Sequence, residues 1–224
     1  MNGEPRWLGV DAHGPGLSVA LVEGGDTLAL VEWREARSAG HRLMSWVEEI
    51  VDAFGPPDRV AVGIGPGSFT GVRVAVTAAK TLAWAWDIPI HAVSSLAAQA
   101  ASYPERDVAI LATAEYRAGR AYGGVYWRGA AGVEVLERDR LIEASALGHA
   151  LRRYGRTVVL GPVSGDAPLM AHWPAAERGM AGSAAVGAVA AAETLARDPV
   201  SPLALAPAYG REPGITRPPG VPVA

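Results

Sequence analysis

The clearest signal in this chain is the stretch Gly65-Pro66-Gly67-Ser68-Phe69-Thr70-Gly71-Val72-Arg73. An apolar run at 60–64 precedes it, and a helical pattern from Val74 to Trp86 follows at once. A strand, a glycine-rich turn and a helix N-terminus in that order form a possible anion site, because free backbone N–H groups and the helix dipole point the same way. The stretch therefore predicts either a phosphate cradle or a tight turn that brings two backbones together.

The two interpretations of this turn can be weighed from its residues. Glycines permit a tight strand-to-helix turn and the close approach of another backbone, and Ser68 can cap the helix that follows. The chain has no Gly-Lys-Ser/Thr sequence of the Walker type, and Lys80 lies too far along the helix to reach a phosphate at its start. We favour the structural interpretation, and keep Gly65 and Gly67, together with Asp11, as candidates for a degenerate phosphate site.

Composition narrows the possible functions. The chain has 224 residues, half of them hydrophobic, which is enough for one sizeable core or two small domains. Its net charge of −3 argues against an autonomous nucleic-acid binder, which usually has a basic face. Without cysteine there is no disulfide, thiolate nucleophile or Cys-ligated metal. We see no signal-peptide pattern and no membrane-spanning run, and therefore expect a cytoplasmic protein.

The order of predicted elements repeats along the chain. The first half is predicted to hold strands at 7–11, 17–23, 27–33, 60–64 and 89–93, and helices at 40–54, 74–86 and 94–103. The second half is predicted to hold strands at 108–113, 120–127, 133–138 and 157–160, and helices at 144–154 and 183–197. Two consecutive β-β-β-α-β-α units predict a duplicated α/β architecture, with lobes at 1–104 and 105–211. The Pro-rich residues 212–224 are expected to form a flexible tail.

This duplicated pattern resembles the actin-like ATPase superfamily, a two-lobed fold in which each half is ribonuclease-H-like. In that fold an Asp and glycines of the first hairpin approach a phosphate, and the hairpin here is 11–16. Asp11 can hold a metal or water, or simply form an Asx turn. We favour the turn, because the second half has no companion acid at the matching place, Glu115 being the nearest. The candidate adenosine loop at 161–166 is better explained as an ordinary loop, since Pro162 removes a backbone donor.

The sequence at 65–73 resembles the glycine-rich motif of the TsaB (YeaZ) family. A match of this length is far more specific than a lone Gly-x-Gly motif would be. Supporting matches are Ala79-Lys80-Thr81-Leu82-Ala83, Val93-Ser94-Ser95-Leu96, Val10-Asp11, Gly40-His41, Tyr122 and Pro207-Ala208-Tyr209-Gly210-Arg211. The chain departs from the family pattern at Ala12, at 115–117 and at Arg120, the first two of which fall where an ancestral active cleft would lie.

The resemblance implies a non-catalytic scaffold subunit of the bacterial machinery that makes N6-threonylcarbamoyladenosine on tRNA. It implies three partners, namely the transferase TsaD, the ATPase TsaE and a second copy of the chain through the TsaD-binding surface, with tRNA reached through the complex. ATP, Mg²⁺ and threonylcarbamoyl-AMP would be used by the complex, and this chain is expected to carry no cofactor or catalytic residue. The alternative is a free-standing actin-like ATPase or small-molecule kinase that uses Asp11. A peptidase is least favoured, because metal ligands at the right spacing and a Ser-His-Asp set are missing.

Two helices are predicted to form the partner surface. In the helix after the glycines, Phe69, Val72, Val76, Ala79, Ala83 and Trp86 form a stripe expected to face the sheet, and in the helix at 40–54 the inward residues are Leu43, Val47, Ile50 and Phe54. Small residues and a Trp on a mixed surface suit helix packing between chains, and Met adapts to binding surfaces. The predicted interface residues are His41, Met44, Glu48, Ser68, Phe69, Thr70, Gly71, Arg73, Val74, Thr77, Lys80 and Trp84. The alternative for the helix after the glycines is a solvated face. For the helix at 40–54, His41 is alternatively a polar helix-start residue and Met44 core filler.

Overall fold

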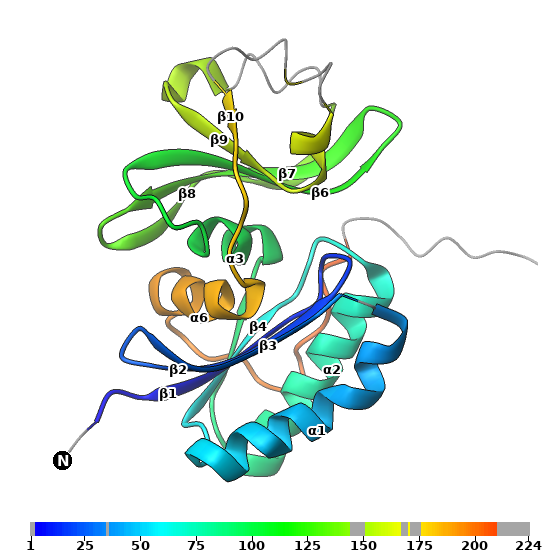
Figure 1. Cartoon of the computed structure of the whole chain (residues 1–224), viewed down its shortest axis with the longest axis vertical. Helices are drawn as coiled ribbons and strands as arrows, with labels where there is room; N and C mark the ends of the chain where they lie inside the picture. Colours follow the sequence, from blue (N-terminus) through cyan, green and yellow to red (C-terminus); the bar gives the residue numbers. More distant parts are fainter. Residues whose placement is uncertain (1–2, 35, 144–150, 167–169, 171–175, 210–224) are drawn as a thin grey trace, which may run out of the picture.

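The computed structural model describes residues 3–34, 36–143, 151–166, 170 and 176–209, without the side chains of 36–41 and 152. It consists of two lobes, each built on a five-stranded mixed sheet, with two helices between the sheets (Figure 1). No helix within the described ranges has the length and hydropathy needed to span a membrane.

The first sheet has the strand order β3-β2-β1-β4-β5. Its strands are β1 (Arg6–Asp11), β2 (Leu17–Glu23), β3 (Asp26–Trp33), β4 (Arg59–Gly63) and β5 (Ile90–Val93). Strands β1 to β3 form an antiparallel meander, whereas β4 and β5 add in parallel to β1. The parallel additions require crossover helices, which are α1 (Ala36–Phe54) and α2 (Phe69–Trp86) on one face of this sheet (Figure 1).

The second sheet repeats this arrangement, with the strand order β8-β7-β6-β9-β10. Its strands are β6 (Val108–Arg117), β7 (Arg120–Gly129), β8 (Gly132–Glu143), β9 (Thr157–Leu160) and β10 (Ala176–Arg178). Strand directions match those of the first sheet, so the duplicated α/β fold expected from sequence is confirmed. Strand β10 was not predicted, because three residues with a polar end give no apolar periodicity.

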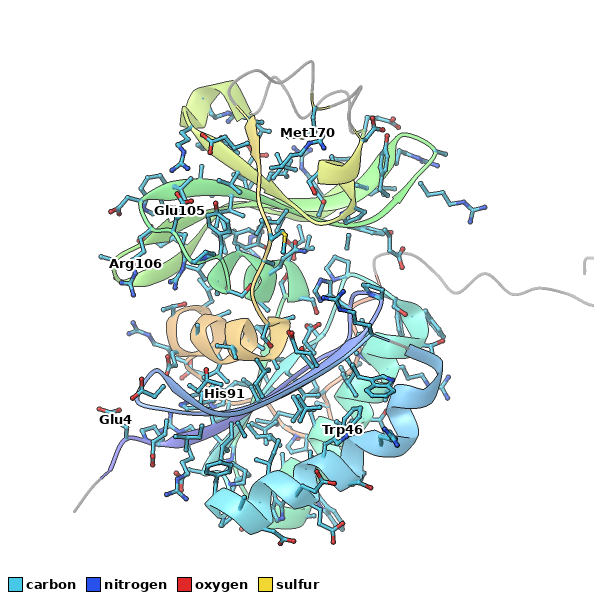
Figure 2. All side chains as sticks on the ribbon, viewed as in Figure 1. Glu4, Trp46, His91, Glu105, Arg106 and Met170 are labelled. Atoms are coloured by element: carbon cyan, nitrogen blue, oxygen red, sulfur yellow. The ribbon has the colours of Figure 1, made fainter. Side chains whose placement is uncertain are left out.

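Two helices lie between the lobes, and each packs on the sheet of the opposite half (Figure 1). They are α3 (Ser95–Ala101), which covers β6 to β8, and α6 (Ala184–Leu195), which covers β1, β2, β4 and β5. The two helices approach so closely that a Cβ at Gly187 would lie 1.9 Å from the Ala98 carbonyl oxygen. Beneath α6, the His91 imidazole packs against Trp7 and contacts the Ala196 carbonyl at 2.7 Å (Figure 2).

The core of the first lobe lies between its sheet and helices α1 and α2. Leu43, Val47 and Ile50 of α1 are buried there as expected, and Trp46 packs against Trp33 at a ring distance of 5.7 Å (Figure 2). Phe54 is an exception, since 42 % of it is exposed. It occupies the final residue of α1, and its carbonyl accepts a hydrogen bond from Arg6 Nη1 at 2.6 Å.

The segment at 200–209 returns from α6 to the first lobe, although the sequence assigned it to the second. Val200 bonds to Ile90 beside β5, and the Ala208 N–H donates to the Ile64 carbonyl at 2.7 Å. Leu205 is buried against the core of the first lobe. The predicted tail at 212–224 lies outside the described residues. So does most of the helix predicted at 144–154, of which Arg152–Tyr154 form a 3₁₀ turn.

Candidate functional site

The glycine-rich turn packs directly on the hairpin between β1 and β2. A Cβ at Gly67 would lie 2.4 Å from the His13 carbonyl oxygen, and one at Gly71 would lie 2.1 Å from the Ala12 carbonyl oxygen. The Ser68 N–H donates to the His13 carbonyl at 2.7 Å, which holds the two segments together. These glycines are therefore required by close backbone contact, and the structural interpretation of the turn accounts for them.

The other side of the turn is fixed by α3 and the C-terminal segment. Gly65 has a φ of 98°, and a Cβ there would lie 2.8 Å from the Ala208 carbonyl oxygen. Its N–H donates to Ser95 Oγ at 3.0 Å, and its carbonyl accepts from the Ser95 N–H at 2.9 Å. Ser68 caps α2 as predicted, since its hydroxyl oxygen accepts from the Gly71 N–H at 3.3 Å.

Asp11 is buried, and both of its carboxylate oxygens have partners. Oδ1 accepts from the His13 N–H at 2.9 Å, as in an Asx turn, and lies 2.5 Å from His13 Nδ1. Oδ2 accepts from Ser95 Oγ at 2.7 Å. Burial acts to raise the pKa of Asp11, but the charge and hydrogen bonds of His13 outweigh it and hold the pKa below its usual value. Asp11 thus ties the first hairpin to the start of α3.

The second hairpin and the candidate adenosine loop form a separate cluster in the second lobe. The loop turns through a 3₁₀ segment, Pro162–Gly165, whose Val163 N–H points to Thr113 Oγ1 at 3.4 Å. Tyr116, beside Glu115, donates its hydroxyl hydrogen to Asp166 at 2.7 Å. These contacts are those of an ordinary packed loop, the interpretation that the sequence favours.

The outer face of α2 is open to solvent over most of its length. Thr70, Arg73 and Thr77 are exposed, and Trp84 is 70 % exposed. The neighbouring α1 exposes Met44 and Glu48, and lies beside α2 on the same face of the first sheet (Figure 1). The side chain of His41 lies outside the described residues. The exposed members of the predicted interface are here called the α1–α2 face, and the binding of a partner to it remains a prediction. They are Met44, Glu48, Thr70, Arg73, Thr77 and Trp84.

Several predicted interface residues instead make contacts within this chain. Phe69 does not face the sheet, as its place in the helical stripe predicted, but stacks on Tyr209 at a ring distance of 4.4 Å and stays 41 % exposed. Lys80 is half-buried and donates from Nζ to the Leu205 carbonyl at 3.0 Å. Val74 packs against the core, and Gly71 lies against Ala12.

A cavity of about 300 Å³ opens between the lobes next to this turn. Its lining includes Gly65, Pro66, Ser94, Tyr122, Asp139 and Tyr209. Asp139 was not predicted from the sequence; its carboxylate accepts from Tyr126 within the second sheet and from Ser94 of the first lobe. In the sequence, Tyr122 and Tyr209 stand out only as matches to the family pattern.

The chain is similar in sequence to proteins of tRNA threonylcarbamoyladenosine biosynthesis. Residues 35–117 match the family model "TsaD: tRNA N6-adenosine threonylcarbamoyltransferase". The chain is 37 % identical over 123 residues to "tRNA threonylcarbamoyladenosine biosynthesis protein TsaB" of Bacillus subtilis. That alignment covers 53 % of this chain and 54 % of the relative, so the chain spans about half the length of the curated relatives it matches.

Solved structures resemble the chain over nearly its whole length. A protein described as having "similarity to peptidase YEAZ", from Pseudomonas aeruginosa, superposes with a TM-score of 0.78 at 26 % identity, covering 92 % of this chain and 100 % of the other. A ROK family protein from Streptococcus pneumoniae, solved with sucrose, gives a TM-score of 0.51 at 10 % identity, covering 83 % of this chain and 96 % of the other. The second likeness concerns the fold alone and places both lobes in the actin-like architecture.

Proposed function

The chain belongs to the TsaB/YeaZ family of tRNA threonylcarbamoyladenosine biosynthesis proteins, and on that premise we propose that it is a non-catalytic subunit of the machinery that makes this tRNA modification. Its role is to bind and activate the transferase TsaD through the α1–α2 face. The observation that carries this proposal is the exposure of Met44, Thr77 and Trp84 on two adjacent helices.

The α1–α2 face has the chemistry of a helix-docking surface. Trp84 and Met44 are apolar side chains that a monomer leaves in water, and the exposed Thr77 of α2 is small enough to admit a partner helix. Two actin-like subunits that dock through equivalent helix pairs would form a four-helix junction, burying roughly 1,200–2,000 Å² in a standard interface. The same face can serve a second copy of this chain, so homodimer and heterodimer compete for it.

The other components of the proposed complex bind to TsaD or to the pair of subunits, and not to this chain alone. We propose that TsaE binds the pair, that tRNA is reached through the complex, and that ATP, Mg²⁺ and threonylcarbamoyl-AMP are used there. The buried chemistry of this chain supports a passive role, because Asp11 uses one oxygen for His13 and the other for Ser95. An ATPase acting through Asp11 would have to use a carboxylate that is buried and already hydrogen-bonded on both oxygens.

The test is co-expression with the TsaD of the same organism, followed by chromatography with light scattering. We expect a stable heterodimer that Thr77→Glu and Met44→Glu disrupt, because each places a charge in the buried junction. Thr27→Glu, at another exposed threonine, on β3, is the matched control and should leave the heterodimer intact. If both α1–α2 variants bind TsaD like the wild type, the proposed surface is wrong.

Calorimetry with Mg-ATP on the isolated chain addresses the ATPase alternative. The scaffold proposal expects no binding that depends on Asp11. Clear binding that Asp11→Asn abolishes would favour the ATPase, since the variant keeps the size of the side chain and removes its charge.

A further inference from the structure

The cavity between the lobes is built from segments that are far apart in sequence. The glycine-rich turn and Ser94 come from the first lobe, Tyr122 and Asp139 come from β7 and β8 of the second, and Tyr209 comes from the C-terminal segment. Its volume of about 300 Å³ is at the lower end of the range for small-molecule pockets. Neither the α1–α2 face nor the Asp11 cluster contributes to this lining.

A β-bulge aims Asp139 toward this cavity. Gly123 pairs with Arg140 and Val125 pairs with Glu137, so two residues of β8 oppose the single Gly124 of β7. Such bulges re-aim a side chain, and they are frequent beside active sites. Gly124 leaves the room that the carboxylate occupies, since a Cβ there would lie 2.2 Å from Asp139 Oδ1.

The Asp139 carboxylate is held in place but has acceptor capacity left. Ser94 Oγ donates to one of its oxygens and the Tyr126 hydroxyl donates to the other. Each carboxylate oxygen carries two lone pairs, so one donor on each leaves the group able to accept more. Burial, followed by the charge of Asp139, raises the pKa of the Tyr126 hydroxyl, which therefore stays a donor to this carboxylate.

Two further polar residues belong to the lining, Tyr122 and Arg140. Tyr122 is 6 % exposed. Among the residues that the structure describes, Arg140 pairs with Glu137 alone, at 3.3 Å and with 65 % of its side chain exposed, a geometry that contributes little free energy. Glu137 keeps other partners in Tyr154 and Arg153, so Arg140 can turn to a ligand at low cost.

We propose that this cavity binds a small zwitterion, an α-amino acid with an apolar or aromatic side chain. The lining presents one carboxylate, Asp139, and one cation, Arg140, so a ligand with only one sign of charge would meet a like charge. A zwitterion satisfies both, with its ammonium group toward Asp139 and its carboxylate toward Arg140. The apolar lining residues are Ile64, Pro66, Leu141 and Ala208, and they suit an apolar side chain of the ligand.

The site is independent of the proposed scaffold role, so it can be tested on the isolated full chain. Calorimetry with L-leucine and L-phenylalanine as probes should show binding with a Kd of about 1 mM or tighter. Isocaproate lacks the amino group of leucine, and isoamylamine lacks its carboxylate. Both should bind at least about tenfold more weakly, because each loses one of the two charge contacts.

Variants on β8 provide the matched comparison. Arg140→Gln should weaken leucine or phenylalanine binding by about tenfold or more, whereas Arg138→Gln, an exposed arginine outside the lining, should not change it. Circular dichroism of both variants checks that the fold is kept. The proposal is overturned if neither amino acid binds, if Arg140→Gln leaves the Kd unchanged, or if either single-charge analogue binds as well as leucine. Preferential binding of AMP would also overturn it, because the cavity would then select a nucleotide.

Discussion

Asp11 and His13 form a buried ion pair, with 2.5 Å between Oδ1 and Nδ1, at the hairpin on which the glycine-rich turn packs. Burial acts to lower the pKa of His13, but the Asp11 carboxylate outweighs it and raises that pKa above its ordinary value of 6.5. The same pair lowers the pKa of Asp11, as described above. The two groups are therefore both charged over a window that starts below pH 3.8 and extends above pH 6.5.

This pair predicts a specific pH dependence of folding. A raised folded-state pKa on His13 adds stability that is fully present below pH 6.5 and is lost as pH rises through the higher folded value. A lowered pKa on Asp11 adds stability that is present above pH 3.8 and is lost as pH falls through the lower folded value. The wild type should thus lose free energy of unfolding on the alkaline side.

Urea unfolding across that alkaline range tests the prediction against His13→Asn, in which an amide can still donate to Asp11 but cannot become charged. The difference in free energy of unfolding between the two proteins should shrink as pH rises. A difference that does not depend on pH would show that His13 is neutral in the folded state. Asp11→Ala should cost about 3–5 kcal/mol near neutral pH, since it leaves the buried imidazolium without its partner.

The glycines of the turn predict a second set of effects. Gly71→Ala should destabilise the chain by about 1–3 kcal/mol or more, because its Cβ would meet the Ala12 carbonyl oxygen at 2.1 Å and the backbones must move apart. Gly14→Ala is the matched control, since a Cβ there has no neighbour within 4 Å. Thermal unfolding of the two variants gives the comparison. Equal melting temperatures would mean that the contact between turn and hairpin does not limit stability.

The sequence predicted most of the fold because several strands, such as β2 and β9, are short apolar runs that are followed by glycine. Strands β2 and β9 were predicted to the residue, and the α2 cap was identified from Ser68 alone. These features depend on local periodicity and local hydrogen bonds, which a sequence displays directly. Strand β10 has neither, and exists because its three residues pair in parallel with β9.

Some site residues were placed wrongly or missed by the sequence analysis, because their positions depend on contacts between segments that are distant in sequence. Phe69 fits the apolar stripe of α2, but its ring stacks on that of Tyr209, which lies far along the chain. From the sequence, Lys80 is expected to be a surface residue. In the structure it binds the Leu205 carbonyl, which lies far along the chain. Asp139 was missed because its direction depends on a bulge opposite Gly124, and a shift in strand register is not visible in either strand alone.

The Lys80 contact predicts that α2 holds the C-terminal segment in place. Lys80→Met keeps the aliphatic stem and removes the donor to the Leu205 carbonyl, so the segment at 205–209 should open more often. The readout is hydrogen exchange at the Ala208 amide, which donates to Ile64. We expect faster exchange there by about tenfold, with Arg73→Met, an exposed position on the same helix, as the control. Unchanged protection at Ala208 would show that Leu205 burial and the stacking of Tyr209 on Phe69 hold the segment without the Lys80 hydrogen bond.

The contact between Ser94 and Asp139 predicts coupling between the lobes. Ser94 also caps α3, since its Oγ accepts from the Leu96 N–H at 3.0 Å and the Ala97 N–H at 3.3 Å. Ser94→Ala should therefore cost about 1–2 kcal/mol for the lost cap alone, in addition to the interlobe hydrogen bond. A double-mutant cycle with Asp139→Ala separates the two contributions, because only the interlobe contact is shared by both variants.

We expect a coupling free energy of about 0.5–3 kcal/mol from urea unfolding of the four proteins in that cycle. The serine hydroxyl serves the carboxylate and the helix end at once, so the second mutation should cost less when the first is already present. Ser102→Ala, whose hydroxyl bonds only within its own lobe to the Gln99 carbonyl at 2.8 Å, provides the matched serine and should show additive effects with Asp139→Ala. Additivity for Ser94 as well would mean that the packing of α3 against α6, and not this hydrogen bond, holds the two lobes together.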